Sequence, residues 1–266
     1  MKVCGALMSV LCLPFLVFAE TTEEALWRHR SLGKAFYENS ATQYQAVEAF
    51  KKALDLVPNS AQERVNYGLA MIRAGKEAEG IVELEKAQQQ DPTIPHTWFN
   101  LGIVYKRRSQ YVKAIEQLEG MMKLVPDEAI THYNLGVLYK LEKKNDLALM
   151  HFEKAAALDP SLAGPHYHLA TVYRQAQKMD KFKESITTFR RTKKEQIGAA
   201  VPEDLEWSFY AEIYETIDPY HAGDTEQTSE LTFETTTLVK ELSGMVVLDA
   251  NNDQRPDLLA WSNTGM

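Results

Sequence analysis

The sequence predicts an all-α fold, a right-handed α-solenoid of about five stacked helix pairs over residues 24–200. The first observation is a constant interval of 34 residues between four prolines, namely Pro58, Pro92, Pro126 and Pro160. The second is that each proline closes a similar stretch of apolar residues at helical spacing. A unit of this length cannot bury its own apolar face, so stacking against neighbouring units must complete the core.

The same residue types return at the same places in each unit. The unit ending at Pro126 contains Trp98, Leu101-Gly102, Tyr105, Ala114 and Leu118, and the next contains His132, Leu135-Gly136, Tyr139, Ala148 and Phe152. We expect the glycine and the alanine to let the two helices of a unit approach closely. The proline should end the second helix, because it disfavours a helical conformation in the residue before it.

This pattern resembles the tetratricopeptide repeat family over roughly Glu24 to Ala200. The resemblance implies that the first helix of each unit lines a concave surface. Two columns recur there at the repeat interval, an aromatic one and a cationic one: Phe99, Tyr133 and Tyr167, and Lys106, Lys140 and Arg174. We predict that they form a groove for an extended peptide that carries carboxylates. The alternative is that the aromatics pack between units and the cations are solvated surface.

Three asparagines, Asn66, Asn100 and Asn134, also recur at this interval. Some members of the family hold a peptide's C-terminal carboxylate in a clamp of lysine and asparagine. The residues before these asparagines are Val65, Phe99 and Tyr133, and none is the lysine that such a clamp uses. The sequence therefore disfavours that clamp, and asparagine at this place is also common in the family for helix packing.

The first nineteen residues predict a signal peptide, with Lys2 before an uncharged apolar stretch and a cleavage site after Ala19. The alternative is an uncleaved membrane anchor, although the stretch is only marginally long enough to span a bilayer. Both cysteines, Cys4 and Cys12, lie inside this segment, so a cleaved chain would have no disulfide. We expect an exported protein, periplasmic or secreted, with no stable membrane insertion after signal removal.

Beyond Ala200 the pattern changes. Residues 202–217 are aromatic-rich at helical spacing and predict a capping helix over the end of the stack, with Trp207 and Tyr214 as packing residues. Residues 218–230 predict a polar linker. Residues 231–266 are rich in Thr, Val and Phe and predict a short, incomplete β segment.

One motif in that segment suggests metal chemistry. Oxygen side chains alternate between two apolar runs, a spacing that resembles the calcium loop of FG-GAP, or integrin-like, β-propeller blades. The resemblance implies Ca²⁺ bound by the side chains of Asp249, Asn251, Asp253 and Asp257 and by the carbonyl of Arg255. Gln254 replaces the family's glycine, and the alternative is an acidic turn without metal. A single blade cannot close a propeller, so we expect a larger protein.

Charge and motifs narrow the function. The formal net charge of −8 disfavours a nucleic-acid partner. No glycine-rich phosphate loop, metalloprotease motif or nucleophile elbow is present. We therefore predict a non-enzymatic scaffold that binds a protein or peptide in the groove and is fused to a calcium-binding β domain. The alternative is the recruiting module of a larger enzyme, or of a carbohydrate or surface adhesion protein, whose active part lies beyond residue 266.

Overall fold

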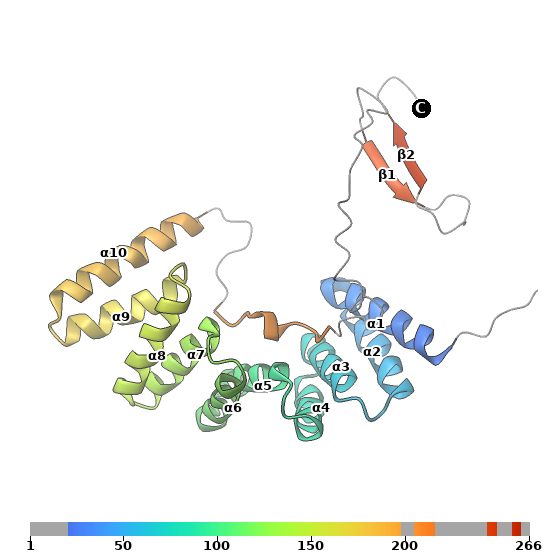
Figure 1. Ribbon diagram of the computed structural model, residues 1–266, viewed down its shortest axis with the longest axis horizontal. Helices are drawn as coiled ribbons and strands as arrows, with labels where there is room; N and C mark the ends of the chain where they lie inside the picture. Colours follow the sequence, from blue (N-terminus) through green and yellow to red (C-terminus); the bar gives the residue numbers. More distant parts are fainter. Residues whose placement is uncertain (1–20, 198–204, 216–243, 249–256, 262–266) are drawn as a thin grey trace, which may run out of the picture. The chain divides into compact units, whose positions relative to one another are not determined.

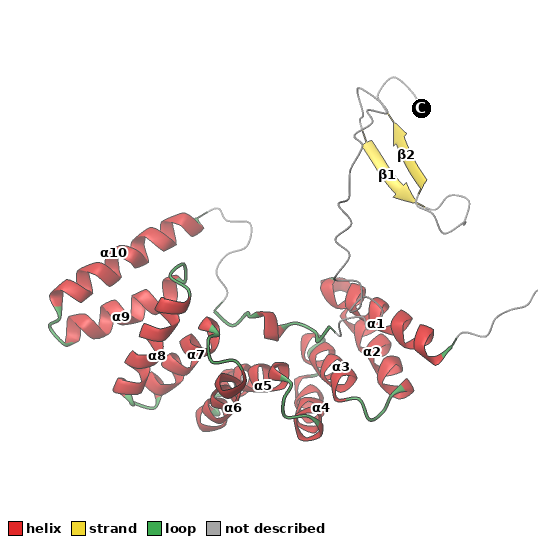
Figure 2. Ribbon diagram, in the orientation of Figure 1, coloured by secondary structure: helices red, strands yellow, loops and turns green. Residues whose placement is uncertain are grey.

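A computed structural model of the chain describes residues 21–197, 205–215, 244–248 and 257–261. The chain divides into two compact units, Met1–Thr216 and Ile217–Met266. The first holds all of the described helices and the second holds a strand pair (Figures 1 and 2). Because the two units are separate bodies, each is described by itself.

Over its described residues, the first unit forms five consecutive pairs of antiparallel helices (Figure 1). The pairs are α1 (Thr22–Glu38) with α2 (Gln43–Leu56), α3 (Ala61–Arg73) with α4 (Glu77–Gln90), α5 (Pro95–Arg107) with α6 (Tyr111–Leu124), α7 (Ala129–Leu141) with α8 (Asn145–Leu158), and α9 (Ala163–Gln175) with α10 (Met179–Gln196). A 3₁₀ turn, η1 (Ser40–Thr42), joins the helices of the first pair. The predicted α-solenoid of about five helix pairs is confirmed.

Close contact between the helices of a pair depends on glycine, as expected. A methyl group placed on Gly102 would lie 2.6 Å from the side chain of Leu118, and one on Gly136 would lie 2.7 Å from the ring of Phe152. Leu118 and Phe152 are themselves fully buried. Each glycine therefore leaves the space that the large side chain of the partner helix fills.

The prolines of the 34-residue interval stand in the turns that follow the second helices, and a side chain six residues later binds each proline carbonyl. Arg64 Nη2 donates to Pro58 at 2.8 Å, and Trp98 Nε1 donates to Pro92 at 2.8 Å. His132 Nε2 makes the same contact with Pro126 at 2.9 Å. The repeat position that holds Arg64, Trp98 and His132 therefore caps the preceding turn.

A recurring tyrosine–glutamate hydrogen bond joins neighbouring units. The hydroxyl of Tyr105 donates to Glu85 at 2.5 Å, and Tyr139 and Tyr173 make the equivalent bond to a glutamate twenty residues earlier. Each bond runs from the first helix of one unit to the second helix of the unit before it. Burial and the neighbouring carboxylate raise the pKa of Tyr105 to about 12, so the hydroxyl remains a donor at physiological pH.

The predicted capping helix over 202–217 is wrong for its described part, residues 205–215. That stretch contains no α-helix: it has a turn at residues 205–206, one 3₁₀ turn, η2 (Phe209–Ala211), and otherwise no regular structure. Its backbone groups bind side chains of the solenoid in place of bonds within a helix. Figure 1 shows it running past α7, α5 and α3, and its residues Ser208 and Ile213 are buried. We call residues 205–215 the strap.

The second unit contains an antiparallel pair, β1 (Gly244–Leu248) and β2 (Asp257–Trp261), with Val246 opposite Leu259. Strands are therefore present on both sides of the proposed calcium loop. The loop itself, residues 249–256 with Asp249, Asn251, Asp253 and Arg255, lies outside the described residues. So do the predicted signal peptide, residues 1–19, and the predicted linker, residues 218–230. Among the described helices, none is long and apolar enough to cross a membrane.

Candidate peptide-binding groove

One asparagine in the first helix of each of three successive units binds the main chain of the strap. Asn134 Nδ2 donates to the carbonyl of Leu205 at 2.8 Å, and Asn100 Nδ2 donates to the carbonyl of Tyr210 at 2.7 Å. Asn66 makes two bonds to Tyr214: its Nδ2 donates to the carbonyl at 2.8 Å, and its Oδ1 accepts from the amide at 2.6 Å. The three asparagines form a ladder that holds an extended chain. We call this face of α1, α3, α5 and α7 the groove.

The ladder itself is fixed in place by the helices that carry it. Asn100 and Asn134 also donate to the carbonyl four residues earlier in their own helix, at 2.8 Å and 2.9 Å. Lys106 Nζ donates to Asn134 Oδ1 at 2.6 Å. These bonds hold the two amides in the orientation that the strap uses, and a donor fixed in this way loses little entropy on binding.

The strap runs opposite to the order of the units, from α7 towards α1. Because the asparagines contact only its carbonyls and one amide, this part of the contact is independent of the strap's side chains. Main-chain bonds of this kind supply affinity, and side-chain pockets then supply specificity. In the fifth unit the ladder position is His168, whose ring stacks on Phe152 at 4.5 Å between centroids.

Charge complementarity accompanies the ladder. Glu206 of the strap lies 2.7 Å from Lys106 Nζ and 2.7 Å from Arg107 Nη2. Burial acts to raise the pKa of the Glu206 carboxyl, but hydrogen bonds and charge from these two cations outweigh it, and the pKa is lowered. Arg73 approaches Glu212 at 3.9 Å. The cations of α3 and α5 therefore face the carboxylates of the strap.

His96, at the start of α5, lies beneath the strap. Its ring meets the rings of Phe209, Tyr210 and Tyr214 edge-on, with centroids 5.0–5.8 Å apart. The side chain is 4% exposed, and neither ring nitrogen has a hydrogen-bond partner within the described part of the chain. Burial lowers the pKa of His96 from 6.5 to about 4, so the strap covers a neutral imidazole.

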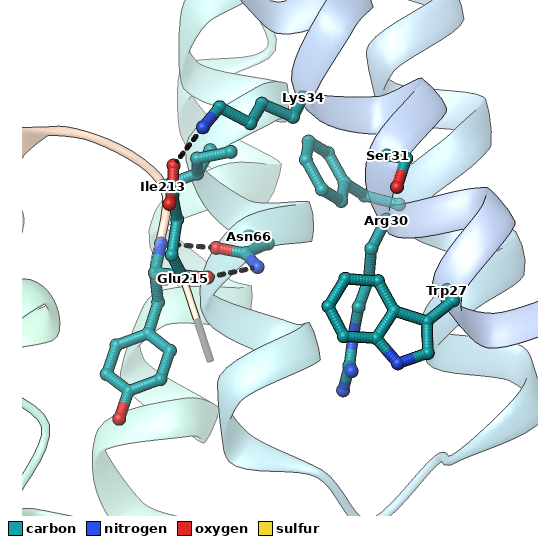
Figure 3. Close-up of a pocket in the computed structure, with 9 residues that line it drawn as sticks. Trp27, Arg30, Ser31, Lys34, Asn66, Ile213 and Glu215 are labelled. Atoms are coloured by element: carbon teal, nitrogen blue, oxygen red, sulfur yellow. Dashed lines mark hydrogen bonds and ion pairs between the residues drawn. The ribbon is translucent and has the colours of Figure 1, made fainter. Parts of the chain in front are cut away.

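The groove continues past the end of the strap into a hollow of about 190 Å³ (Figure 3). Figure 3 shows Trp27, Arg30 and Ser31 on one side, with Asn66, Ile213 and Glu215 on the other. Lys34 of α1 forms an ion pair with Glu215. By alignment of the units, Ser31 stands where the next three units have the ladder asparagine, so the first unit supplies a shorter polar side chain.

The predicted columns are only partly in this groove. Lys106 binds the strap, but Phe99 is fully buried and Tyr133 is 9% exposed, in contact with the rings of Phe152 and His168. Both aromatic side chains are therefore packed inside the solenoid. Lys140, Tyr167 and Arg174 are exposed on the last two units; Lys140 Nζ lies 3.3 Å from His168 Nδ1. A role in binding a partner stays a prediction for all six.

On α5 the face that lines the groove begins at Asn100, one residue after the predicted Phe99. A hollow of about 350 Å³ under the strap is lined on α5 by Asn100, Ile103, Val104 and Arg107. These positions are i, i+3, i+4 and i+7, which form one helix face. A shift of one residue turns the face by about 100°, which explains why Asn100 rather than Phe99 faces the strap. The recurrence of asparagine was visible in the sequence, but its role was missed.

Residues 129–162, which span α7 and α8, match a family model described as the tetratricopeptide repeat. The α7–α8 pair therefore matches a tetratricopeptide repeat, and the other described pairs share its helix-pair fold. A solved structure of MamA from Desulfovibrio magneticus RS-1 is 18% identical over 68% of this chain and 100% of its own, with a TM-score of 0.56. A structure of PilF from Pseudomonas aeruginosa is 21% identical over 64% of this chain and 78% of its own, with a TM-score of 0.57. At these identities the likeness shows the fold. No curated protein matches the chain.

Within the described residues, no group of three or more His, Cys, Asp or Glu side chains is placed to hold a metal ion. The paired histidines His132 and His151, with Nδ1 atoms 2.9 Å apart, are buried between α7 and α8. Because His132 Nε2 must donate to the carbonyl of Pro126, its Nδ1 accepts from His151. These histidines pack the repeat.

Proposed function

We propose that this protein is a non-enzymatic scaffold that binds an extended segment of a partner protein in the tetratricopeptide groove. The observation that carries the proposal is the ladder of Asn66, Asn100 and Asn134, which holds the main chain of residues 205–215. A surface that already holds one extended chain has the donors, spacing and charge to hold another.

The test is an array of eleven-residue peptides with acidic and aromatic residues. Because the strap covers the groove, the probe is the full chain with Glu206→Lys and Glu212→Lys, which place positive charge next to Arg107 and Arg73. We expect binding to a subset of peptides. Adding Asn66→Ala, Asn100→Ala and Asn134→Ala should abolish it, whereas adding Asn145→Ala, an exposed residue of α8, should not. Binding that survives loss of the ladder would place the ligand elsewhere.

The two termini support further proposals. Export with removal of residues 1–19 predicts Glu20 as the first residue of the exported protein, which mass analysis would show. A calcium site in the loop 249–257 predicts one bound ion in calorimetric titration, lost on Asp253→Ala. An unprocessed N-terminus, or an unchanged stoichiometry, would end the respective proposal.

A further inference from the structure

We propose that the strap is an intramolecular stand-in for the partner, so that the groove recognises an extended acidic peptide that must displace residues 205–215. This inference rests on the proposed function, which is binding of an extended chain in the same groove. It adds the chemical class of the ligand, its direction and a competition that regulates access.

The class of ligand follows from the contacts of the strap. The cations of α3 and α5 form ion pairs with two carboxylates of the strap, Glu206 and Glu212. Between them Ser208 is 3% exposed, so a small side chain is required there. Ile213 is 8% exposed and provides an apolar anchor next to Asn66. The expected ligand therefore carries two carboxylates six residues apart, followed at once by an aliphatic residue, and runs from α7 towards α3.

The strap can leave without dismantling the helix pairs. Its largest side chains stay partly in solvent, since Trp207 is 53% exposed and Phe209 is 68% exposed. The helix pairs are held by their own buried residues, such as Phe50, Leu118 and Phe152. Replacing the strap by a similar peptide would restore each contact that its departure breaks.

The tether sets the strength of the competition. Only residues 197–204 separate the end of α10 from the strap in sequence. A short tether of this kind gives an effective concentration in the millimolar range. A free peptide of identical sequence then binds with an apparent Kd equal to its intrinsic Kd plus that effective concentration. The unaltered chain should therefore bind it no tighter than about 1 mM.

The experiment titrates the synthetic peptide of residues 205–215 into three full-length ¹⁵N-labelled chains. These are the unaltered chain, the strap variant Glu206→Lys/Glu212→Lys, and the control Glu48→Lys/Glu116→Lys, whose glutamates are exposed on α2 and α6. We expect the strap variant to bind the peptide at least tenfold more tightly than the other two chains. A peptide with both glutamates replaced by lysine should bind none of them. In the unaltered chain, several millimolar peptide should move the strap signals to their positions in the strap variant.

Each other result overturns a distinct part of the account. Equal, tight binding to the unaltered chain and the strap variant would refute the competition and keep the proposed function. No binding to a strap variant whose strap signals have left the groove would refute the proposed function itself. If the NMR signals of the strap in Glu206→Lys/Glu212→Lys show that it still occupies the groove, the groove does not select for carboxylates. Loss of helical circular dichroism in the strap variant, with no displacement in the unaltered chain, would make the strap a fixed part of the fold.

Discussion

Removing one rung of the asparagine ladder should free the end of the strap. Asn66→Ala deletes both bonds to Tyr214, at 2.8 Å and 2.6 Å. At about 1 kcal/mol net for each hydrogen bond, the seated strap should lose about 2 kcal/mol. Since 1.4 kcal/mol corresponds to a factor of ten, the open population should rise about 30-fold.

The Tyr214 amide reports this change directly, because it is one of the two lost donors. Amide hydrogen exchange measured by NMR should show that amide exchanging at least about 30-fold faster in Asn66→Ala, because it loses its own acceptor while the strap also opens more often. Amides in the middle of α7 should keep their rates, and the exposed-site control Asn145→Ala should match the unaltered chain. If Tyr214 exchanges at the same rate in Asn66→Ala and the unaltered chain, the ladder does not hold the strap.

Three further predictions concern pH, turns and the contact between units. The pKa of His96 is about 4 when the strap covers it and 6.5 when it is free, so His96 binds a proton more readily after the strap has left. The seated state is therefore most stable above pH 6.5, and its stability falls as pH drops towards 4. The open population of the strap, measured by amide exchange and corrected for intrinsic rates, should be greater at pH 5 than at pH 7. Equal open populations at the two pH values would contradict this prediction. The turns of the second and fourth helix pairs contain a residue with positive φ, +80° at Gly75 and 60° at Lys143. Gly75→Ala should therefore lower the free energy of unfolding by about 1 kcal/mol in urea denaturation, and Lys143→Gly should raise it by about as much. Changes of the opposite sign would contradict this reasoning. Tyr139→Phe deletes a bond to the preceding unit and should lower that free energy by about 1 kcal/mol, whereas Tyr111→Phe should leave it nearly unchanged, and equal effects would show that the bond contributes nothing.

The solenoid could be predicted because its signals are local. A glycine one turn before an aromatic residue, and a proline after the second helix, each act on residues that are close in sequence. The structure places Gly102 against Leu118 and Pro92 under Trp98, as a repeat of that pattern requires. Because the pattern recurs every 34 residues, each local signal is seen again in several units, which strengthens the prediction.

The strap could not be predicted from local pattern. Its apolar residues Leu205, Phe209 and Ile213 are four apart, a spacing typical of a helix. In the structure these residues lie along the groove instead, and the neighbouring Tyr214 forms a hydrogen bond with Asn66, which is 148 residues away in sequence. The recurring asparagines also lacked the lysine of the clamp against which they were compared. Their role depends on a segment far away in the chain.

The central claim is that residues 205–215 occupy the groove over the asparagine ladder. Nuclear Overhauser effects between the ring protons of His96 and those of Phe209, Tyr210 and Tyr214 test it most directly, because the ring centroids are 5.0–5.8 Å apart. The account predicts these contacts in the unaltered chain at pH 7 and their loss in Glu206→Lys/Glu212→Lys. A His96 ring without aromatic contacts in the unaltered chain would contradict it.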